Sequence, residues 1–233
     1  MATNVVFGLL RLAVLTAAVS SGPIAGYDVA ATATYVWLGQ GLMAVVVLWG
    51  DNHLAERVRT GDVVIDLYRP WHLQMALLAE DVGRAGYAVV VRLAPPIAFG
   101  ALFFPFRWPA PGVLPVFAVS VALGVTVSFG MRFLLNATAF WLLDSRGTQA
   151  LYTAFTWLFC GLAVPIAFFP DWARAVVWST PFPSMLQAPV EVFLERGSPW
   201  PLLAGQAFWA VAVLAAGHLV LNRAVRKVVV QGG

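Results

Sequence analysis

The sequence predicts an all-α integral membrane protein with six transmembrane helices, and composition is the first observation behind this prediction. Of the 233 residues, 61% are hydrophobic and only 11% are charged, and the mean hydropathy is +0.81. A soluble domain normally has about a quarter charged residues, so the natural solvent of this chain is lipid. The second observation is a series of six apolar stretches with many of the 10 Trp and 16 Phe residues near their ends, as in the aromatic belts of a bilayer.

The six stretches are expected to form one transmembrane domain over residues 1–233. A spanning helix needs about 20 mostly apolar residues. Five stretches reach this length, and the first is marginal. Connections rich in Gly and Pro separate several of them, because irregular backbone is expected outside the hydrocarbon core. The predicted spans cover residues 5–19, 30–50, 87–106, 113–143, 151–169 and 202–221.

The distribution of basic residues sets the predicted orientation. With the N-terminus inside, eight basic residues fall in cytoplasmic segments and three in outer segments, so the positive-inside rule predicts both termini in the cytoplasm. The first stretch has an alternative interpretation as the apolar region of a cleaved signal peptide, although no basic region precedes it. Outside the C-terminus the basic residues are scattered singly, a pattern that does not indicate nucleic-acid binding.

The segment between spans two and three, residues 51–86, is expected to be a cytoplasmic working surface. It carries ten charged residues and is too long for a simple turn between antiparallel helices. Gly61 and Pro70 divide it, and from Trp71 the apolar spacing predicts a short helix that leads into span three. The segment is either a solvated loop stabilised by Glu/Arg pairs or a docking surface for a soluble partner, formed by Glu56, Arg57, Arg59, Asp62, Asp66 and Arg69.

The segment between spans five and six, residues 168–201, is apolar yet contains six prolines, so no single helix can cross there. Two short helices are expected between the prolines, at about residues 172–179 and 185–195. A segment that is apolar but broken is predicted to be re-entrant or interfacial and to cover the outer mouth of the bundle. The alternative is a plain outer loop that rests on lipid.

Few residues inside the predicted spans can carry chemistry. No Asp or Glu lies in the interior of a span, which disfavours an ion-coupled or proton-coupled carrier. His218 stands alone in span six, and the single cysteine, Cys160, excludes an intrachain disulfide. The chain has no phosphate-binding loop, zinc-protease motif or nucleophile elbow. We therefore expect no enzymatic activity, no catalytic residue, no metal site and no cofactor bound by this chain.

Arg132 is the most costly residue in a predicted span, because it is expected near the middle of the bilayer and must face protein or water. It belongs to a stripe of small and polar residues that recurs every four positions along span four and permits close approach of another helix. This stripe, with polar residues of spans two and five, lines either a translocation path or a helix interface. The candidates are Gln40, Ser128, Arg132, Asn136, Thr153 and Thr156.

Several segments resemble one known family. Residues 61–86 (GDVVIDLYRPWHLQMALLAEDVGRAG) resemble the first cytoplasmic loop of bacterial type-2 ABC exporter permeases, especially an actinobacterial six-span branch associated with drug export. Residues 34–42 (TYVWLGQGL) are similar to the family as well. Residues 133–147 (FLLNATAFWLLDSRG) and 161–189 (GLAVPIAFFPDWARAVVWSTPFPSMLQAP) match its Phe-Trp span end and its proline-rich outer segment.

The resemblance implies the transmembrane permease subunit of an ABC exporter in the bacterial plasma membrane. Residues 51–86 would contain the coupling helix that contacts a separate ATPase subunit, on which ATP and Mg²⁺ bind. Two permeases, identical copies or sister subunits, would form the translocation path at their interface within the lipid. The ATPase can drive such a path only if it binds the inward-open and outward-open states with different affinity.

Two other functions stay open. A membrane-embedded lipid-modifying enzyme would need a polar constellation at one membrane interface, and its candidates are His53, His72, Asp51 and Asp62. A structural membrane subunit without a transport path would show only dry, tightly packed contacts around Arg132 and Thr153.

Overall fold

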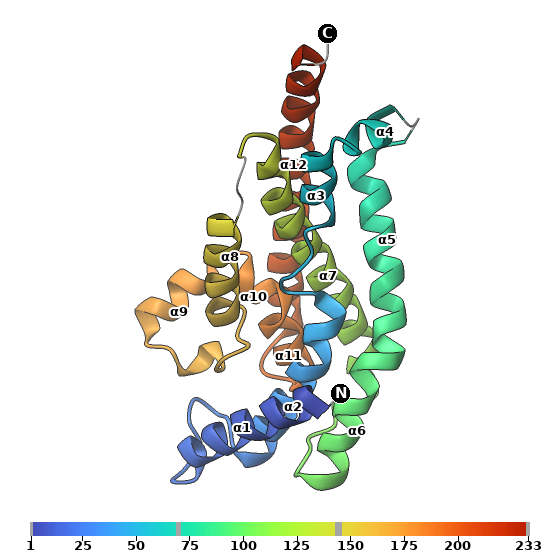
Figure 1. Ribbon diagram of the computed structural model, residues 1–233. Helices are drawn as coiled ribbons and strands as arrows, with labels where there is room; N and C mark the ends of the chain where they lie inside the picture. The colour runs from blue at the N-terminus through green and yellow to red at the C-terminus, as the bar shows by residue number, and fades with distance from the viewer. Residues whose placement is uncertain (1, 69–70, 143–145, 232–233) are drawn as a thin grey trace.

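The computed structural model describes residues 2–68, 71–142 and 146–231, and within these ranges its regular elements are helices (Figure 1). A π-helical segment, Val89–Leu93, joins α5 to α6, and 3-10 turns cover Thr138–Phe140 and Ile166–Phe168. The α-helices are α1 (Ala2–Val19), α2 (Val29–Val46), α3 (His53–Thr60), α4 (Val63–Tyr68), α5 (Leu73–Ala88), α6 (Ala94–Phe103), α7 (Val113–Ala137), α8 (Arg146–Phe159), α9 (Asp171–Trp178), α10 (Phe182–Met185), α11 (Gln187–Phe193) and α12 (Pro199–Gln231).

Four stretches of helix are long and apolar enough to cross a membrane, in agreement with the prediction of a multi-pass helical membrane protein. They are Val29–Val46, Leu73–Phe103, Val113–Phe140 and Pro199–Val225. The third predicted span begins at Leu73 rather than residue 87, because the short helix expected before it continues into it. The fourth ends at Phe140 rather than residue 143.

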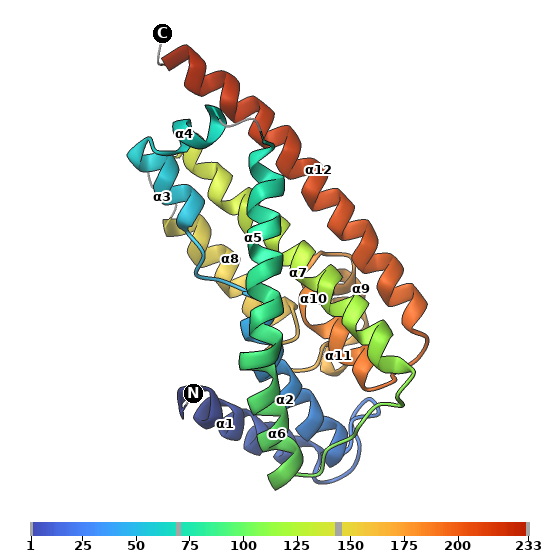
Figure 2. The same cartoon turned by 90° about the vertical axis from the view of Figure 1, so that its right-hand side faces the viewer.

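The other two predicted spans are not among these four helices. α1 has 18 residues and lies crosswise to α5 and α12 at the end of the bundle that carries α6 (Figures 1 and 2). α8 has 14 residues and ends at Phe159, so the expected continuous helix over residues 151–169 is wrong. Gly161 follows with φ +81°, and a Cβ atom there would lie 2.1 Å from Oε1 of Gln187. Only glycine tolerates both conditions.

α7 is the central helix of the bundle, and it contacts α2, α5, α10, α11 and α12 (Figure 2). Its small residues allow close approach. A Cβ atom on Gly130 would lie 2.3 Å from Cγ2 of Val213 on α12, and one on Gly124 would lie 2.8 Å from the carbonyl oxygen of Met185. Because the neighbouring helices approach the backbone of α7 this closely, the polar residues further along α7 have fixed positions.

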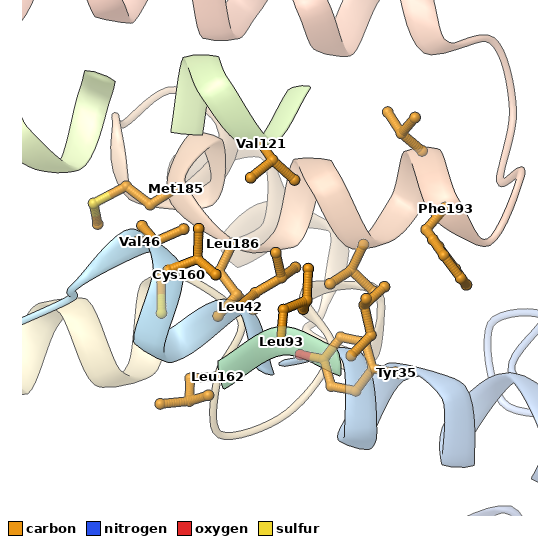
Figure 3. Packing of buried hydrophobic residues seen from close by; sticks show 14 of the residues in the cluster. Tyr35, Leu42, Val46, Leu93, Val121, Cys160, Leu162, Met185, Leu186 and Phe193 are labelled. Carbon is orange, nitrogen blue, oxygen red and sulfur yellow. The ribbon is translucent and has the colours of Figure 1, made fainter. Parts of the chain in front are cut away.

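The proline-rich outer segment folds as α9, α10 and α11, close to the two short helices predicted for it. α10 and α11 fold back into the bundle against α7. Met185 and Leu186 are fully buried there (Figure 3), and so is Val190. α9 is more peripheral, and its Trp172 side chain is exposed. The second half of the outer segment is therefore part of the core.

Candidate functional site

Arg132 joins the charged segment, residues 51–86, to α7 at two points. Arg132 lies on α7 with 3% of its side chain exposed. Its Nη1 forms an ion pair with Asp51, where the charged segment begins. Its Nη2 donates a hydrogen bond of 2.7 Å to Oδ2 of Asp81, near the end of the segment on α5. One side chain therefore ties both ends of the charged segment to the central helix.

Asn136, one turn further along α7, holds the start of α3. Its Nδ2 donates a hydrogen bond of 2.8 Å to the backbone oxygen of Asp51, and its Oδ1 accepts one of 3.1 Å from the backbone N–H of Ala55. The residue at the N-cap of α3, Asn52, makes no capping hydrogen bond with its own side chain. Asn136 thus satisfies a helix N–H that would otherwise lack a partner, and it fixes α3 to α7.

The C-terminal end of α2 meets the same group of residues. Arg84 on α5 donates to Oδ1 of Asp81 at 2.8 Å and to the carbonyl oxygens of Ala44 and Val45 at 3.2 and 2.8 Å. Ser128 on α7 donates to the carbonyl oxygen of Val47 at 2.8 Å. These bonds join α2, α3, α5 and α7 at one place, which we call the Arg132 cluster: Asp51, Asp81, Arg84, Arg132 and Asn136.

Two cavities adjoin the Arg132 cluster. The larger has a volume of about 410 Å³, and its polar lining includes His53, Glu80 and members of the cluster. The smaller, of about 170 Å³, is lined in part by Arg132, Tyr152 and Thr153. A purely structural subunit would have close packing throughout this region. The surroundings of Arg132 and Thr153 instead contain these two cavities.

Buried carboxylates are present, contrary to the expectation from the predicted spans. Asp81 lies within the continuous helix Leu73–Phe103 and is buried. Asp66 on α4 and Glu191 on α11 are buried as well. Each pairs with arginine: Asp81 with Arg84 and Arg132, Asp66 with Arg57, and Glu191 with Arg196. Such pairing holds helices together, since either charge alone would be costly to bury. Because each of these buried carboxylates is held by an arginine, none of them is free to carry an ion or a proton, which disfavours ion-coupled transport.

The predicted docking residues of the charged segment fall into three groups. Glu56, Arg59 and Asp62 are exposed. Arg57 and Asp66 form an ion pair between α3 and α4, so they connect the two short helices. Arg69 lies outside the described residues.

Two exposed apolar side chains of α4 were not among the predicted docking residues. Tyr68 is 86% exposed, and Ile65, three positions earlier, is 60% exposed. Their spacing places them on one face of a helix. This spacing was the sequence signal that could have identified them.

The candidate path residues are divided between the Arg132 cluster and its surroundings. Arg132 and Asn136 belong to the cluster, and Ser128 contacts it. Gln40 and Thr156 are buried elsewhere in the bundle. Thr153 is exposed, and its Oγ1 donates to the carbonyl oxygen of Gln149 on its own helix at 2.8 Å. The six candidates thus do not form one continuous lining.

The sequence suggested that His218 stands alone, but the structure places two polar side chains beside it. Nδ1 of His218 lies 2.8 Å from Nε2 of His72, and Nε2 of His218 lies 2.9 Å from Nδ2 of Asn222. Gln74 also donates to the carbonyl oxygen of Leu214 at 3.0 Å. These contacts fix the start of α5 to α12. Because His72 is engaged there while His53 lines the larger cavity, the constellation considered for an enzyme is not assembled.

A second polar cluster lies at the opposite end of the bundle. Oε1 of Glu191 accepts hydrogen bonds from the Tyr27 hydroxyl at 2.9 Å and from Nε2 of Gln187 at 2.6 Å. Oε2 accepts from Nε of Arg196 at 2.8 Å. Burial and the adjacent Glu191 charge raise the pKa of Tyr27, so its hydroxyl stays a donor. The cluster connects the start of α2 with α11.

Comparison with known proteins identifies one match. A family model described as ABC-2 family transporter protein matches residues 3–232, which is nearly the whole chain. No curated protein and no solved structure matches the sequence.

Proposed function

Because the chain belongs to the ABC-2 family of transporter proteins, we propose that this membrane permease is the transmembrane subunit of an ABC exporter. Hydrolysis of ATP takes place on a separate ATPase subunit, which binds ATP and Mg²⁺. The single observation that carries the proposal is the Arg132 cluster. It connects the charged segment, whose exposed residues a soluble ATPase can contact, with the central helix of the bundle.

Transmission through the cluster follows from its bonds. Asn136 and Arg132 hold α3 and both ends of the charged segment on α7. The Arg132–Asp81 bond is buried and charge-assisted, so it is costly to break. A force that shifts α3 and α4 therefore moves α7, and with it the helices packed on α7. A packed interface responds to such a push by changing between discrete arrangements rather than by bending continuously.

The proposed contact with the ATPase is a docking surface on α3 and α4, composed of Glu56, Arg59, Asp62, Ile65 and Tyr68. A large exposed aromatic residue surrounded by charges has the composition of a protein interface. The Arg57–Asp66 ion pair joins α3 to α4, so the two short helices can move together. α3 and α4 lie near the end of the bundle that carries the C-terminal part of α12 (Figure 1).

The proposed topology places the docking surface in the cytoplasm of a bacterium and both termini inside. Six crossings would require α8 to cross together with the four long helices, and α1 to turn from its crosswise position at the end of the bundle (Figures 1 and 2). At 1.5 Å per residue α1 is about 27 Å long and α8 about 21 Å, against a hydrocarbon core of about 30 Å. The irregular chain after Phe159 supplies the remaining length on the fifth crossing. Two permease copies, or one copy with a sister subunit, form the translocation path.

The experiment is purification of the full-length chain with its native partners in mild detergent, followed by reconstitution into vesicles. We expect an ABC ATPase to copurify and its hydrolysis rate to depend on the permease. The triple variant Glu56→Ala, Arg59→Ala, Tyr68→Ala should lose the partner, whereas Arg174→Ala on α9 should retain it. A stable chain that copurifies with no ATPase, or a triple variant that binds and stimulates normally, contradicts the proposal.

A further inference from the structure

A cavity of about 530 Å³ lies between α1, α2 and the π-helical segment that leads into α6. We call it the Arg92 cavity. Most of its wall is apolar and includes Val91, Pro95, Pro96 and Phe99. The side chains in the wall that carry polar atoms are Asn4, Trp37 and Arg92.

Arg92 is an exposed cation without a partner inside an apolar helix. Within the described residues it has no hydrogen bond and no ion pair, in contrast to Arg84, Arg132 and Arg196. Phe103, where the helix ends, is eleven residues further on, about 17 Å at 1.5 Å per residue. This depth is near the middle of a hydrocarbon core of about 30 Å. A cation there is costly unless it meets water or an anion.

The π-helical segment explains why Arg92 stands beside an opening. Pro95 and Pro96 have no backbone N–H and cannot continue an α-helical hydrogen-bond pattern to the preceding turn. The backbone over Val89–Leu93 adopts π-helical geometry instead. Such turns are frequent at functional sites. The proline pair and Arg92 therefore share one wall of the cavity.

Trp37 forms a rigid part of the same cavity wall. Its indole is fully buried, and Nε1 has no hydrogen-bond partner among the described residues, although a buried indole N–H usually finds one. The ring is held in place by close packing: a Cβ atom on Gly8 would lie 2.8 Å from its Cζ3, and one on Gly100 would lie 2.5 Å from its Cγ. The buried indole therefore gives the cavity a rigid wall, and the exposed Arg92 cation beside this apolar wall suits a ligand with an acidic head and an apolar body.

We propose that the Arg92 cavity binds an anionic amphiphile from the membrane. Its carboxylate or phosphate lies on Arg92, and its apolar chain lies against Pro95, Pro96 and Phe99. A second copy of this chain is the poorer occupant, because α1, α2, α6, α7, α8 and α12 contain no Asp or Glu and so offer no carboxylate at this depth. As a binding site the inference stands alone; as the class of exported cargo it rests on the proposed function.

The test is photo-labelling of the full-length chain in phosphatidylcholine nanodiscs without the ATPase. Three probes carry the same diazirine acyl chain, on phosphatidylglycerol, on phosphatidylcholine or as the free fatty acid. We expect adducts at residues of the Arg92 cavity with the anionic probes and about tenfold fewer with phosphatidylcholine, because its choline cation offsets the phosphate charge and leaves no net attraction to Arg92. Comparison of the two anionic probes shows whether a lipid headgroup or a free carboxylate is preferred.

Three variants separate the role of Arg92 from a general effect. Arg92→Gln should reduce anionic labelling to the phosphatidylcholine level, Arg92→Lys should retain it, and Arg223→Gln, at the far end of α12, should leave it unchanged. Equal labelling by all three probes, labelling unaffected by Arg92→Gln, or cross-links between two copies in place of lipid adducts overturns the proposal. Since the ATPase is absent, this result does not depend on the proposed coupling. Stimulation of the assembled ATPase by the anionic probe tests the cargo step separately.

Discussion

Arg132 and Asp81 are 51 positions apart in the sequence, yet Nη2 of Arg132 lies 2.7 Å from Oδ2 of Asp81 and both side chains are buried. This ion pair joins α7 to the helix that ends the charged segment. Because both charges are buried and their other partners, Arg84 and Asp51, are partly exposed, this pair specifies one arrangement of the two helices. The mechanical connection between the charged segment and the core depends on it.

Removal of one partner of this pair should destabilise the chain strongly. Arg132→Met leaves Asp81 buried beside Arg84 alone, and we expect a loss of about 3–5 kcal/mol in the free energy of unfolding. The double variant Arg132→Met, Asp81→Leu should recover much of this loss, because no unpaired charge stays buried. Unfolding in mixed detergent micelles measures both.

The control for this pair is Arg174→Met. Arg174 pairs with Asp171, whose side chain is 92% exposed, so the loss should stay below about 1 kcal/mol. Losses of the same size for Arg132→Met and Arg174→Met would show that the buried pair has no special role.

Asn136→Ala should loosen α3 without unfolding the bundle. The substitution removes the acceptor for the backbone N–H of Ala55 and the donor to the backbone of Asp51, and loss of a cap costs about 1 kcal/mol. We expect hydrogen exchange over residues 53–60 to become several-fold faster. Thr126→Val is the matched control, since Thr126 bonds only to Ala122 on its own helix. If the hydrogen-exchange rate over residues 53–60 were unchanged in Asn136→Ala, Asn136 would have no part in coupling α3 to α7.

Tyr68→Ala should weaken binding of the ATPase and leave the fold intact. An exposed aromatic residue at the centre of an interface typically contributes about 2 kcal/mol or more, which corresponds to roughly a thirtyfold loss of affinity. The control is Tyr87→Ala, because Tyr87 is also exposed, at 66%, but lies on α5 away from α4. Titration of purified ATPase against the reconstituted variants measures the difference. Equal effects of the two substitutions would exclude a docking role for Tyr68.

Gly161→Ala should destabilise the chain by more than 1 kcal/mol. The residue has φ +81°, a strained conformation for alanine, and the added Cβ would meet the buried side chain of Gln187. Gly205→Ala in α12 has open space around its Cβ and should be neutral or slightly stabilising. Thermal unfolding in detergent compares the two, and equal midpoints would contradict the packing described for α8.

Much of the architecture follows from hydropathy alone, while helix limits depend on distant residues. The apolar stretches identify the four long helices and the break in the outer segment. Hydropathy does not reveal that α5 continues into the third span, because Leu73–Ala88 carries charged residues. One of them, Asp81, pairs with Arg132 on α7. Nor does it reveal the end of α8 at Phe159, since the apolar run continues, and Gly161 is constrained by Gln187 further along the chain.

The candidate site was only partly predictable for the same reason. The cost of a guanidinium in an apolar helix identifies Arg132 from the sequence. Its partners Asp51 and Asp81 belong to other segments, and no local pattern connects them with α7. His72 and His218 are 146 positions apart, so their contact also depends on the tertiary fold.

The most direct measurement of the proposed coupling is site-specific cross-linking from α4. A photoreactive benzoylphenylalanine replaces Tyr68 in the full-length chain, and the cross-linked partner is identified by mass spectrometry in native membranes. The proposed function predicts an adduct with an ABC ATPase from this position and none from the same group placed at Tyr87. An expressed, folded chain that gives no ATPase adduct from Tyr68, or that gives the same adduct from both positions, would contradict it.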